Sequence, residues 1–540
     1  MKQRLLFLLL LATGSLSVEA QNRKYLVLLK DKANTPYSIS RPQQFLSPRA
    51  ILRRDRQGLA VQEKDLPVNP AYVTALQQTG ARIWFTSRWA NAVLVETTET
   101  NLAAIRALPF VAGIESNRSI GNARIGYSQF ASDPRSNKLE QADPSLYGNA
   151  SEQLLQIGVD KMHARGYHGE GMLVAILDAG FRNANQVPFL SYLFQENRVI
   201  GTYDFVRKET SVYEDDAHGL QVLSIMAGYQ ENKLVGPAYK ASYLLLRTED
   251  AATETPLEEV NWLLGAEYAD STGVDVINSS LGYTTFDDPT QNHTYNDLNG
   301  QTTLVSRAAR WASEAGMLVV VSAGNEGNDP WRYMGAPADV ATVLAIGAVD
   351  RNGNKAAFSS YGPTPDGRIK PDLVAQGAGT TLGSATGSIS TGNGTSYSSP
   401  LVAALATGFW QANPRLTVAQ VIECLRKSGS QFATPDNERG YGIPNFERAS
   451  AIAAESYSLL IYPNPFTGAD RLTVQWNEIP LNQVIDATLT NSAGQVVWRQ
   501  NYSSDRAIHV SLQPLSLSPG LYFLTLSSPT TKRTVKLMKN

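Results

Sequence analysis

The stretch GTSYSSP, residues 394–400, is followed by LVAALATGFW, an alanine-rich apolar run over residues 401–410. Pro400 is compatible with a first helical turn, because an N–H at that position would have no intrahelical partner. The stretch therefore predicts that Ser396 lies at the N-terminus of a buried helix, beside free backbone donors and the positive end of the helix dipole. A serine placed there could act as a nucleophile. Taken alone, however, a Gly-Thr-Ser before a helix is far more often an ordinary helix cap.

Upstream of this stretch, apolar segments that fit buried strands alternate with helical patterns. The strand candidates are residues 172–177, 242–246, 274–277, 318–321 and 343–346, and the helical patterns are residues 220–227, 257–269 and 303–314. Continuous apolar strands separated by helices are typical of a parallel sheet that is covered on both faces. We therefore predict an α/β fold with a mostly parallel, doubly wound sheet. In such folds the chemistry is expected at the carboxyl ends of the strands.

A nucleophilic serine needs a base, a group that orients the base, and donors for the oxyanion. Asp178 directly follows the strand candidate 172–177, where a carboxylate can be partly buried and still reach a neighbour. His218 opens the helical pattern 220–227, and it is the one of five histidines with this placement. Each is more often structural when taken alone, since Asp commonly caps turns. The joint placement of both at a strand end and a helix start favours a catalytic site with Ser396.

Two further segments also follow predicted strands. Asn325 comes after the strand candidate 318–321, and its amide could donate to an oxyanion together with the Ser396 backbone N–H. As a single feature Asn325 is more often a turn residue. Residues 280–282 (Ser-Leu-Gly) could offer backbone groups to an extended peptide, with the glycine leaving room for a side chain.

These segments together resemble the subtilases, a family of serine proteases. The order Asp, His, Ser along the chain is that of the subtilisin type of triad. The segments that carry the resemblance are AILDAG (175–180), HG (218–219), INSSLG (277–282), SAGNEG (322–327), KPDL (370–373) and GTSYSSP (394–400). The resemblance covers residues 150–452 approximately. It implies a sheet of the subtilisin type and a catalytic domain over residues 153–453.

The resemblance also implies roles for individual residues. Ser396 would be the nucleophile, His218 the general base, Asp178 the group that orients the imidazole, and Asn325 an oxyanion donor. The residues expected to bind substrate are Ser280, Leu281, Gly282, Ser322, Ala323 and Gly324. The implied protein is a secreted serine endopeptidase, made as a zymogen, that cleaves protein substrates through an acyl-enzyme. We expect no organic cofactor; structural calcium occurs in the family, but no metal ligands are assigned here.

The sequence departs from the family pattern beside two catalytic positions. Leu220 and Gln221 stand where the family usually continues His-Gly with Thr-His, and Ala179 follows the aspartate in place of Thr or Ser. Tyr397 and Ser398 replace the common Met-Ala after the nucleophile. None of these changes removes a catalytic group. Gln221 and Tyr397 are close enough in sequence to the triad to alter substrate preference or specific activity.

The N-terminal region is predicted to have three parts. Residues 1–20 combine a charged start, a short apolar core and an A-x-A-like end, which is typical of a signal peptide; the alternative, an uncleaved membrane anchor, is disfavoured because the core is short. Residues 21–117 read as a small α+β module and resemble a subtilase propeptide, which would act as an intramolecular inhibitor. Residues 118–152 read as a linker.

The C-terminal region, residues 458–540, contains short alternating strands separated by Gly and Pro, which predicts a β-sandwich. Its segments YPNPF (462–466) and GLYF (520–523) resemble the sorting domain of the type IX secretion system, which implies export across an outer membrane. The alternative is an accessory β-domain that binds substrate, since a fold alone does not fix a function.

Composition limits the classes of partner. The net charge of −2 gives no argument for nucleic acid or an anionic membrane surface. The single cysteine, Cys424, cannot form an internal disulfide, and it lies in a helical apolar pattern. We expect a monomer that meets protein or peptide substrates, its own propeptide and the secretion machinery. Two other functions stay open: a surface-displayed adhesive protein whose subtilase domain has lost turnover, and an esterase that uses the same acyl chemistry.

Overall fold

The computed structural model describes residues 22–122, 146–457, 459–467, 470–476, 479, 483–504, 508–511 and 516–540. The predicted signal peptide and most of the predicted linker lie outside these ranges. The chain divides into two compact units, one built from the segments up to Pro36 and from Val68 to Ile125, the other from Tyr37–Pro67 and Gly126–Asn540. Among the described residues, no helix has both the length and the apolar character needed to cross a membrane.

The first unit is a small α+β module. Its antiparallel sheet has the order β2-β3-β1-β4, with β5 beside β1. The strands are β1 (Arg23–Leu29), β2 (Arg82–Ser87), β3 (Ala92–Thr97), β4 (Val111–Ile114) and β5 (Gly121–Asn122), and the helices are α2 (Pro70–Gln78) and α3 (Glu99–Arg106). Leu76 of α2 and Leu102 and Ile105 of α3 pack with Tyr25 and Val93 of the sheet in one hydrophobic core. These strands and helices form an α+β module, as predicted for this region.

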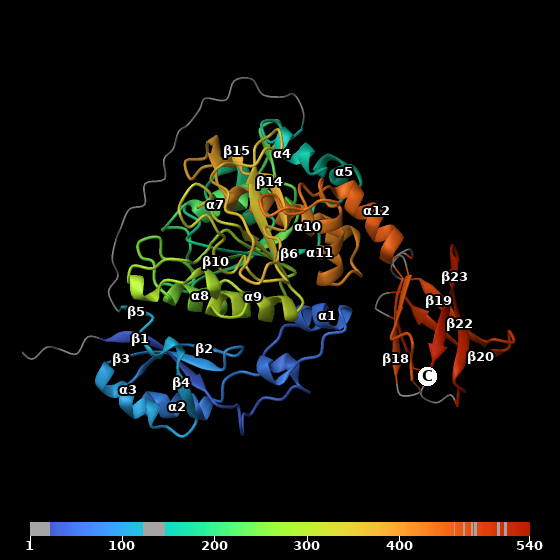
Figure 1. Ribbon diagram of the computed structural model, residues 1–540, viewed down its shortest axis with the longest axis horizontal. Helices are drawn as coiled ribbons and strands as arrows, with labels where there is room; N and C mark the ends of the chain where they lie inside the picture. The colour runs from blue at the N-terminus through green and yellow to red at the C-terminus, as the bar shows by residue number, and fades with distance from the viewer. Residues whose placement is uncertain are drawn as a thin grey trace, which may run out of the picture. The chain divides into compact units, whose positions relative to one another are not determined.

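The second unit contains a seven-stranded parallel sheet within its described residues, in the order β14-β13-β12-β11-β6-β10-β7 (Figure 1). The strands are β6 (Leu173–Asp178), β7 (Val199–Asp204), β10 (Ser242–Arg247), β11 (Val276–Ser279), β12 (Leu318–Ser322), β13 (Leu344–Val349) and β14 (Leu373–Gln376). This confirms the predicted α/β fold and all five predicted strands. Two strands, β7 and β14, were not predicted, because β7 is only partly apolar and β14 is four residues long.

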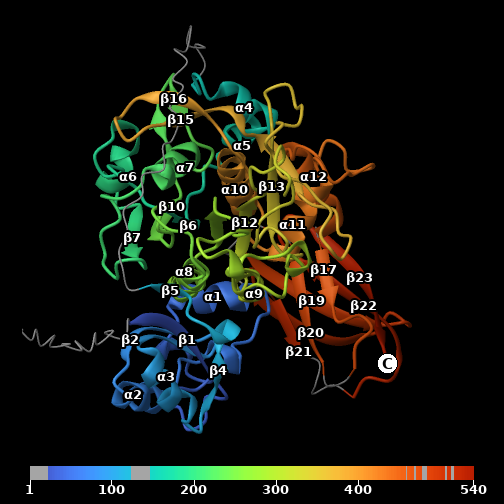
Figure 2. The same ribbon diagram turned by 60° about the vertical axis from the view of Figure 1, so that its left-hand side comes forward.

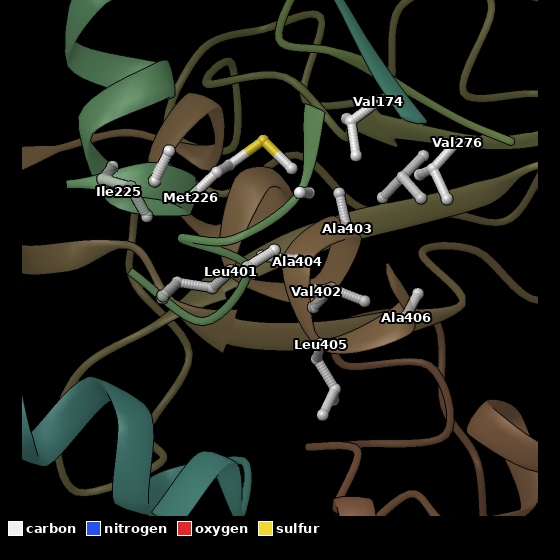
Figure 3. Close-up of a cluster of buried hydrophobic side chains, with 14 of the residues drawn as sticks. Val174, Ile225, Met226, Val276, Leu401, Val402, Ala403, Ala404, Leu405 and Ala406 are labelled. Carbon is white, nitrogen blue, oxygen red and sulfur yellow. The ribbon is translucent and has the colours of Figure 1, made fainter. Parts of the chain in front are cut away.

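Helices cover both faces of this sheet (Figure 2). The helices α7 (His218–Ala227) and α10 (Thr395–Ala412) pack on one face, and α8 (Leu257–Thr272) and α9 (Leu304–Glu314) pack on the other. Figure 3 shows Val174 and Val276 of the sheet beside Ala403 and Ala406 of α10. Small alanine side chains let α10 lie close to the strands, so its N-terminus is held at their carboxyl ends.

The remaining elements of the second unit surround this core. They are α1 (Pro48–Arg56), α4 (Ser151–Gln156), α5 (Val159–Ala164), α6 (Ser191–Gln195), α11 (Val418–Lys427), α12 (Phe446–Tyr457), and two hairpins, β8 (Tyr229–Gln230) with β9 (Leu234–Val235) and β15 (Ala378–Gly383) with β16 (Ile389–Asn393). Although α1 lies in the predicted propeptide module by sequence, it folds with the second unit.

The C-terminal segment forms two antiparallel sheets. One has the order β17-β18-β21 and the other β20-β19-β22-β23. The strands are β17 (Leu459–Tyr462), β18 (Arg471–Trp476), β19 (Val484–Asn491), β20 (Val496–Ser503), β21 (Ile508–Ser511), β22 (Gly520–Ser527) and β23 (Lys532–Lys539). Side chains from both sheets, such as Trp476, Val510, Leu489 and Leu524, share one core. This is a β-sandwich, as predicted.

Candidate active site

Asp178 and His218 form a direct hydrogen-bonded pair at the carboxyl edge of the sheet. Asp178 is the last residue of β6 and is fully buried. His218 Nδ1 lies 2.7 Å from Asp178 Oδ1, and Asp178 Oδ1 also accepts from the Ala179 N–H at 2.8 Å. Because a carboxylate oxygen accepts and an imidazole N–H donates, the hydrogen between them is assigned to Nδ1. Nε2 is then the imidazole nitrogen that remains available as a base.

The residue after His218, Gly219, has no room for a side chain. A Cβ at Gly219 would lie 2.5 Å from the Gly180 carbonyl oxygen and 3.0 Å from Asp178 Cβ. The first turn of α7 therefore packs directly against the end of β6, and a larger residue would push His218 away from Asp178. The His-Gly pair is a packing requirement of the Asp–His contact.

The electrostatics of the pair favour a protonated imidazole. Burial alone would lower the pKa of His218, but the Asp178 carboxylate, through its charge and its hydrogen bond, outweighs burial and raises this pKa to about 9. Asp216 and Glu249 add smaller contributions in the same direction. The site is therefore built to stabilise an imidazolium, the state that a general base reaches after it has accepted a proton.

Arg247 contacts the residue that follows Asp178 and a residue that precedes His218. It is buried at the end of β10, directly opposite Asp178 in the parallel register. Its Nε donates to the Ala179 carbonyl at 3.0 Å, and its Nη1 lies 2.8 Å from Asp204 and 3.1 Å from Asp215. Sequence reasoning missed this arginine. A charged residue that ends an apolar strand run is the signal that could have identified it.

Ser396 lies in the first turn of α10, as predicted, and its side chain is almost fully buried. Its Oγ donates to the Ser280 carbonyl at 3.3 Å, while Ser280 Oγ donates to the Ser396 carbonyl at 3.0 Å. Within the described residues, Ser396 Oγ makes no hydrogen bond to His218. The structure thus brings Asp178 and His218 into contact, and it pairs the Ser396 hydroxyl with the Ser280 carbonyl.

Asn325 is held by the residue that precedes Ser396. Its Oδ1 accepts from the Thr395 N–H at 2.8 Å and from Thr395 Oγ1 at 3.1 Å. Because the Thr395 N–H can only donate, the atom that faces it must be the amide oxygen. The Nδ2 group then points away from Thr395, and within the described residues it makes no hydrogen bond. It is free to donate to a ligand.

The residues predicted to bind substrate follow two neighbouring strands. Ser280, Leu281 and Gly282 come directly after β11, and Ser322 ends β12, with Ala323 and Gly324 following it. Ser280 and Leu281 are buried. Their place beside Ser396 is fixed by the paired Ser280–Ser396 hydrogen bonds, whereas their contact with a substrate stays a prediction.

Gln221 and Tyr397, noted above only as departures from the family pattern, contact each other. Tyr397 Oη donates to Gln221 Oε1 at 2.7 Å, and burial raises the Tyr397 pKa to about 12, so the hydroxyl keeps its proton. The Tyr397 and His218 rings lie 6.1 Å apart between centroids. This hydrogen bond joins the helix that begins with His218 to the helix that carries Ser396. In the sequence, the signal for this hydrogen bond was only that Gln221 and Tyr397 lie close to His218 and Ser396.

No group of three or more His, Cys, Asp or Glu side chains in the described part of the chain is arranged to hold a metal ion. Cys424 is buried in α11, and burial raises the pKa of its thiol to about 12. The thiol is therefore neutral at physiological pH, which suits a packing role.

Comparison with known proteins assigns each region. The family model of the subtilase family matches residues 169–442, that of the peptidase S8 propeptide domain of Bacteroidota matches residues 24–131, and that of a secretion system C-terminal sorting domain matches residues 460–540. The chain is 27% identical to subtilisin NAT of Bacillus subtilis subsp. natto over 379 residues, which are 69% of this chain and 84% of that protein. It is 28% identical to subtilisin DY of Bacillus licheniformis over 296 residues, 54% of this chain and 96% of that protein.

Among solved structures, MycP1 from the ESX-1 type VII secretion system is 24% identical, with a TM-score of 0.45 over 58% of this chain and 87% of that one. The C-terminal match confirms the predicted type IX sorting domain, and with it a protein that is exported to the cell surface or beyond. The central match spans half of the sequence. The chain therefore belongs to the subtilase family and is a subtilisin-like serine endopeptidase with a propeptide domain before its catalytic domain and a secretion sorting domain after it.

Proposed function

We propose that the protein is a secreted zymogen whose mature form hydrolyses peptide bonds through a Ser396–His218–Asp178 triad and an acyl-enzyme. The observation that carries the proposal is the 2.7 Å contact between His218 Nδ1 and a fully buried Asp178 carboxylate. A buried carboxylate with this partner fixes the imidazole tautomer, so that Nε2 accepts the proton of the attacking hydroxyl.

In the proposed reaction, the Ser396 hydroxyl leaves the Ser280 carbonyl and turns toward His218 Nε2. Its oxygen then attacks the scissile carbonyl while His218 takes the proton. His218 next gives that proton to the leaving amine, and a water molecule hydrolyses the acyl-enzyme by the same route in reverse. The hydrogen bond that this step breaks is long, 3.3 Å between Ser396 Oγ and the Ser280 carbonyl oxygen, so its loss costs little compared with the electrostatic stabilisation of the transition state.

Asn325 and the start of α10 supply the proposed oxyanion donors. The Asn325 Nδ2 group has no other hydrogen bond in the described residues, and its amide is held from the opposite side by Thr395. The Ser396 N–H lies in the first turn of a helix, where backbone donors lack intrahelical partners. Two donors held in advance need no reorganisation when negative charge develops on the substrate oxygen.

We further propose that the first unit inhibits the enzyme until it is removed. The match to a propeptide domain supports this role. Its own sheet and helices form a core of their own, which an inhibitor module needs.

The test uses matured protein, a fluorophosphonate probe and a casein substrate, with Ser396→Ala as the comparison. We expect labelling and cleavage in the wild type and neither in the variant. Wild-type protein that is correctly matured but unlabelled would support the adhesive function instead. Labelling without peptide cleavage would support an esterase.

A further inference from the structure

The carboxyl end of α8 is completed by residues from far upstream in the sequence. The last four carbonyls of a helix have no partner within the helix. Gly273 N–H satisfies the first two of these in α8. The other two, those of Ser271 and Thr272, accept from the Ser47 N–H and the Ser47 Oγ, both at 2.9 Å. Without Ser47, these two carbonyls would lose their protein partners.

Two buried arginines follow on α1. Arg53 forms an ion pair with Asp270 and donates to the Val274 carbonyl at 2.6 Å. Arg54 lies 2.8 Å from Asp270 and 3.1 Å from Asp65. All four charged side chains are at most 3% exposed. Asp270 lies in the last turn of α8, where the helix dipole disfavours a negative charge, so Arg53 and Arg54 offset both its burial and its position.

Gln57 makes the corresponding contacts at α9 and α11. Its Nε2 donates to the Gly316 carbonyl, two residues after α9, at 2.7 Å. Its Oε1 accepts from the N–H of Val418, the first residue of α11, at 3.0 Å. That N–H is another group that its own helix cannot satisfy. The Gln57 carboxamide therefore hydrogen-bonds both to the segment that ends α9 and to the first residue of α11.

The fit is close at the backbone level. A Cβ at Gly273 would lie 2.7 Å from the Ala50 nitrogen, and a Cβ at Gly316 would lie 2.7 Å from Gln57 Nε2. Both glycines have positive φ, 94° and 89°, so both helix ends use the left-handed turn that glycine allows. Figure 2 shows α1 beside α8 and α9.

We infer that residues 47–65 are a permanently bound structural segment of the catalytic domain, seated on the carboxyl ends of α8 and α9, and that they stay there after the chain is cut on either side of them. The match to the propeptide family includes these residues, so removal of that whole region would take them away. Their departure would remove both ion pairs of Asp270 and leave the Ser271 and Thr272 carbonyls without the Ser47 donors. The processed enzyme is therefore a complex of two chains.

The test does not depend on turnover. In the full chain carrying Ser396→Ala, recognition sequences for a site-specific protease are inserted after Pro36, after Pro67 and within residues 126–140. After cleavage, the catalytic fraction from size exclusion is analysed by mass spectrometry. We expect the peptide 37–67 to co-elute with the catalytic domain in equal amount. A peptide that elutes alone while the catalytic domain stays folded would overturn the inference.

A matched pair of variants tests the contacts. Arg53→Met with Arg54→Met should release the peptide at least about tenfold faster, since it removes both partners of Asp270. Arg56→Met, an exposed position on the same helix, should leave the release rate unchanged. Equal release rates for the two would contradict the inference.

If the double variant does not fold, hydrogen exchange on the unmutated protein decides. The amides of Ser47 and Val418, which donate to Ser271 and Gln57, should keep their protection after cleavage. Loss of that protection on cleavage would refute the inference that residues 47–65 stay bound to the catalytic domain. Because the engineered cuts are made by an added protease and no readout measures turnover, failure here is distinct from failure of the proposed proteolysis.

Discussion

Replacing Asp178 with Asn should lower the pKa of His218 by about two units or more. Burial lowers this pKa and the carboxylate at 2.7 Å outweighs it, giving about 9. With a pKa of 9, only about 1% of the imidazole is neutral at pH 7. With the carboxylate gone, burial prevails over the smaller effects of Asp216 and Glu249, and the pKa should fall to the ordinary value near 6.5 or below.

The assay is an NMR titration of the imidazole protons in the Ser396→Ala protein, with and without Asp178→Asn. The Ser396→Ala substitution is a suitable background because the Ser396 hydroxyl that it removes donates to Ser280 and makes no hydrogen bond to His218 in the described residues. The chain has five histidines, so the His218 signal can be assigned by loss in a His218→Gln variant. His293 is an internal control, because Glu259 holds its pKa above the ordinary value independently of Asp178.

The reasoning would be refuted by a midpoint near 6.5 in the protein with intact Asp178, or by a midpoint that Asp178→Asn leaves in place. In the active enzyme, the acid limb of kcat/KM should lie near the same pKa of about 9, because the base must be neutral. Asp178→Asn should also reduce kcat by roughly 10³- to 10⁴-fold, since the imidazole loses the acceptor that fixes its tautomer. Below pH 9 the lower pKa of His218 would raise activity, because more of the imidazole is neutral, whereas the lost acceptor would lower kcat. The NMR titration measures the pKa change separately from activity.

Four further outcomes are expected. The raised pKa of His218 stabilises the fold fully below about pH 6.5, and this contribution should be lost as the pH rises through about 9, which urea unfolding of His218→Gln against wild type would show or exclude. Asn325→Leu should lower kcat by about 10²- to 10³-fold with little change in KM, and a loss confined to KM would remove Asn325 from the oxyanion site. Tyr397→Phe should lower kcat about tenfold, and the same loss should appear in Gln221→Leu and not add in the double variant; additive losses would show that the 2.7 Å hydrogen bond does not couple the two helices. Lys370→Met should lower the free energy of unfolding by about 3 kcal/mol in a urea titration, because it takes a buried partner from Asp372; a change under about 1 kcal/mol would contradict this.

The local sequence determined the parallel sheet and the placement of the site residues. Continuous apolar strands must be buried on both faces, so their carboxyl ends meet at one edge. Asp178, Asn325 and residues 280–282 could therefore be placed at that edge from their position after a strand. Ser396 could be placed at a helix start because the apolar run behind it has no polar face.

Side-chain pairing between distant segments was decided only by the tertiary structure. The hydrogen bond from the Ser396 hydroxyl to the Ser280 carbonyl spans 116 residues, and the Gln221–Tyr397 hydrogen bond spans 176 residues. Residues 47–65 precede the predicted linker and were assigned with the propeptide module by their order in the chain. They fold with the catalytic domain because Arg53 meets Asp270 across 217 residues, and a sequence read in order gives no sign of which carboxylate will neutralise a buried arginine.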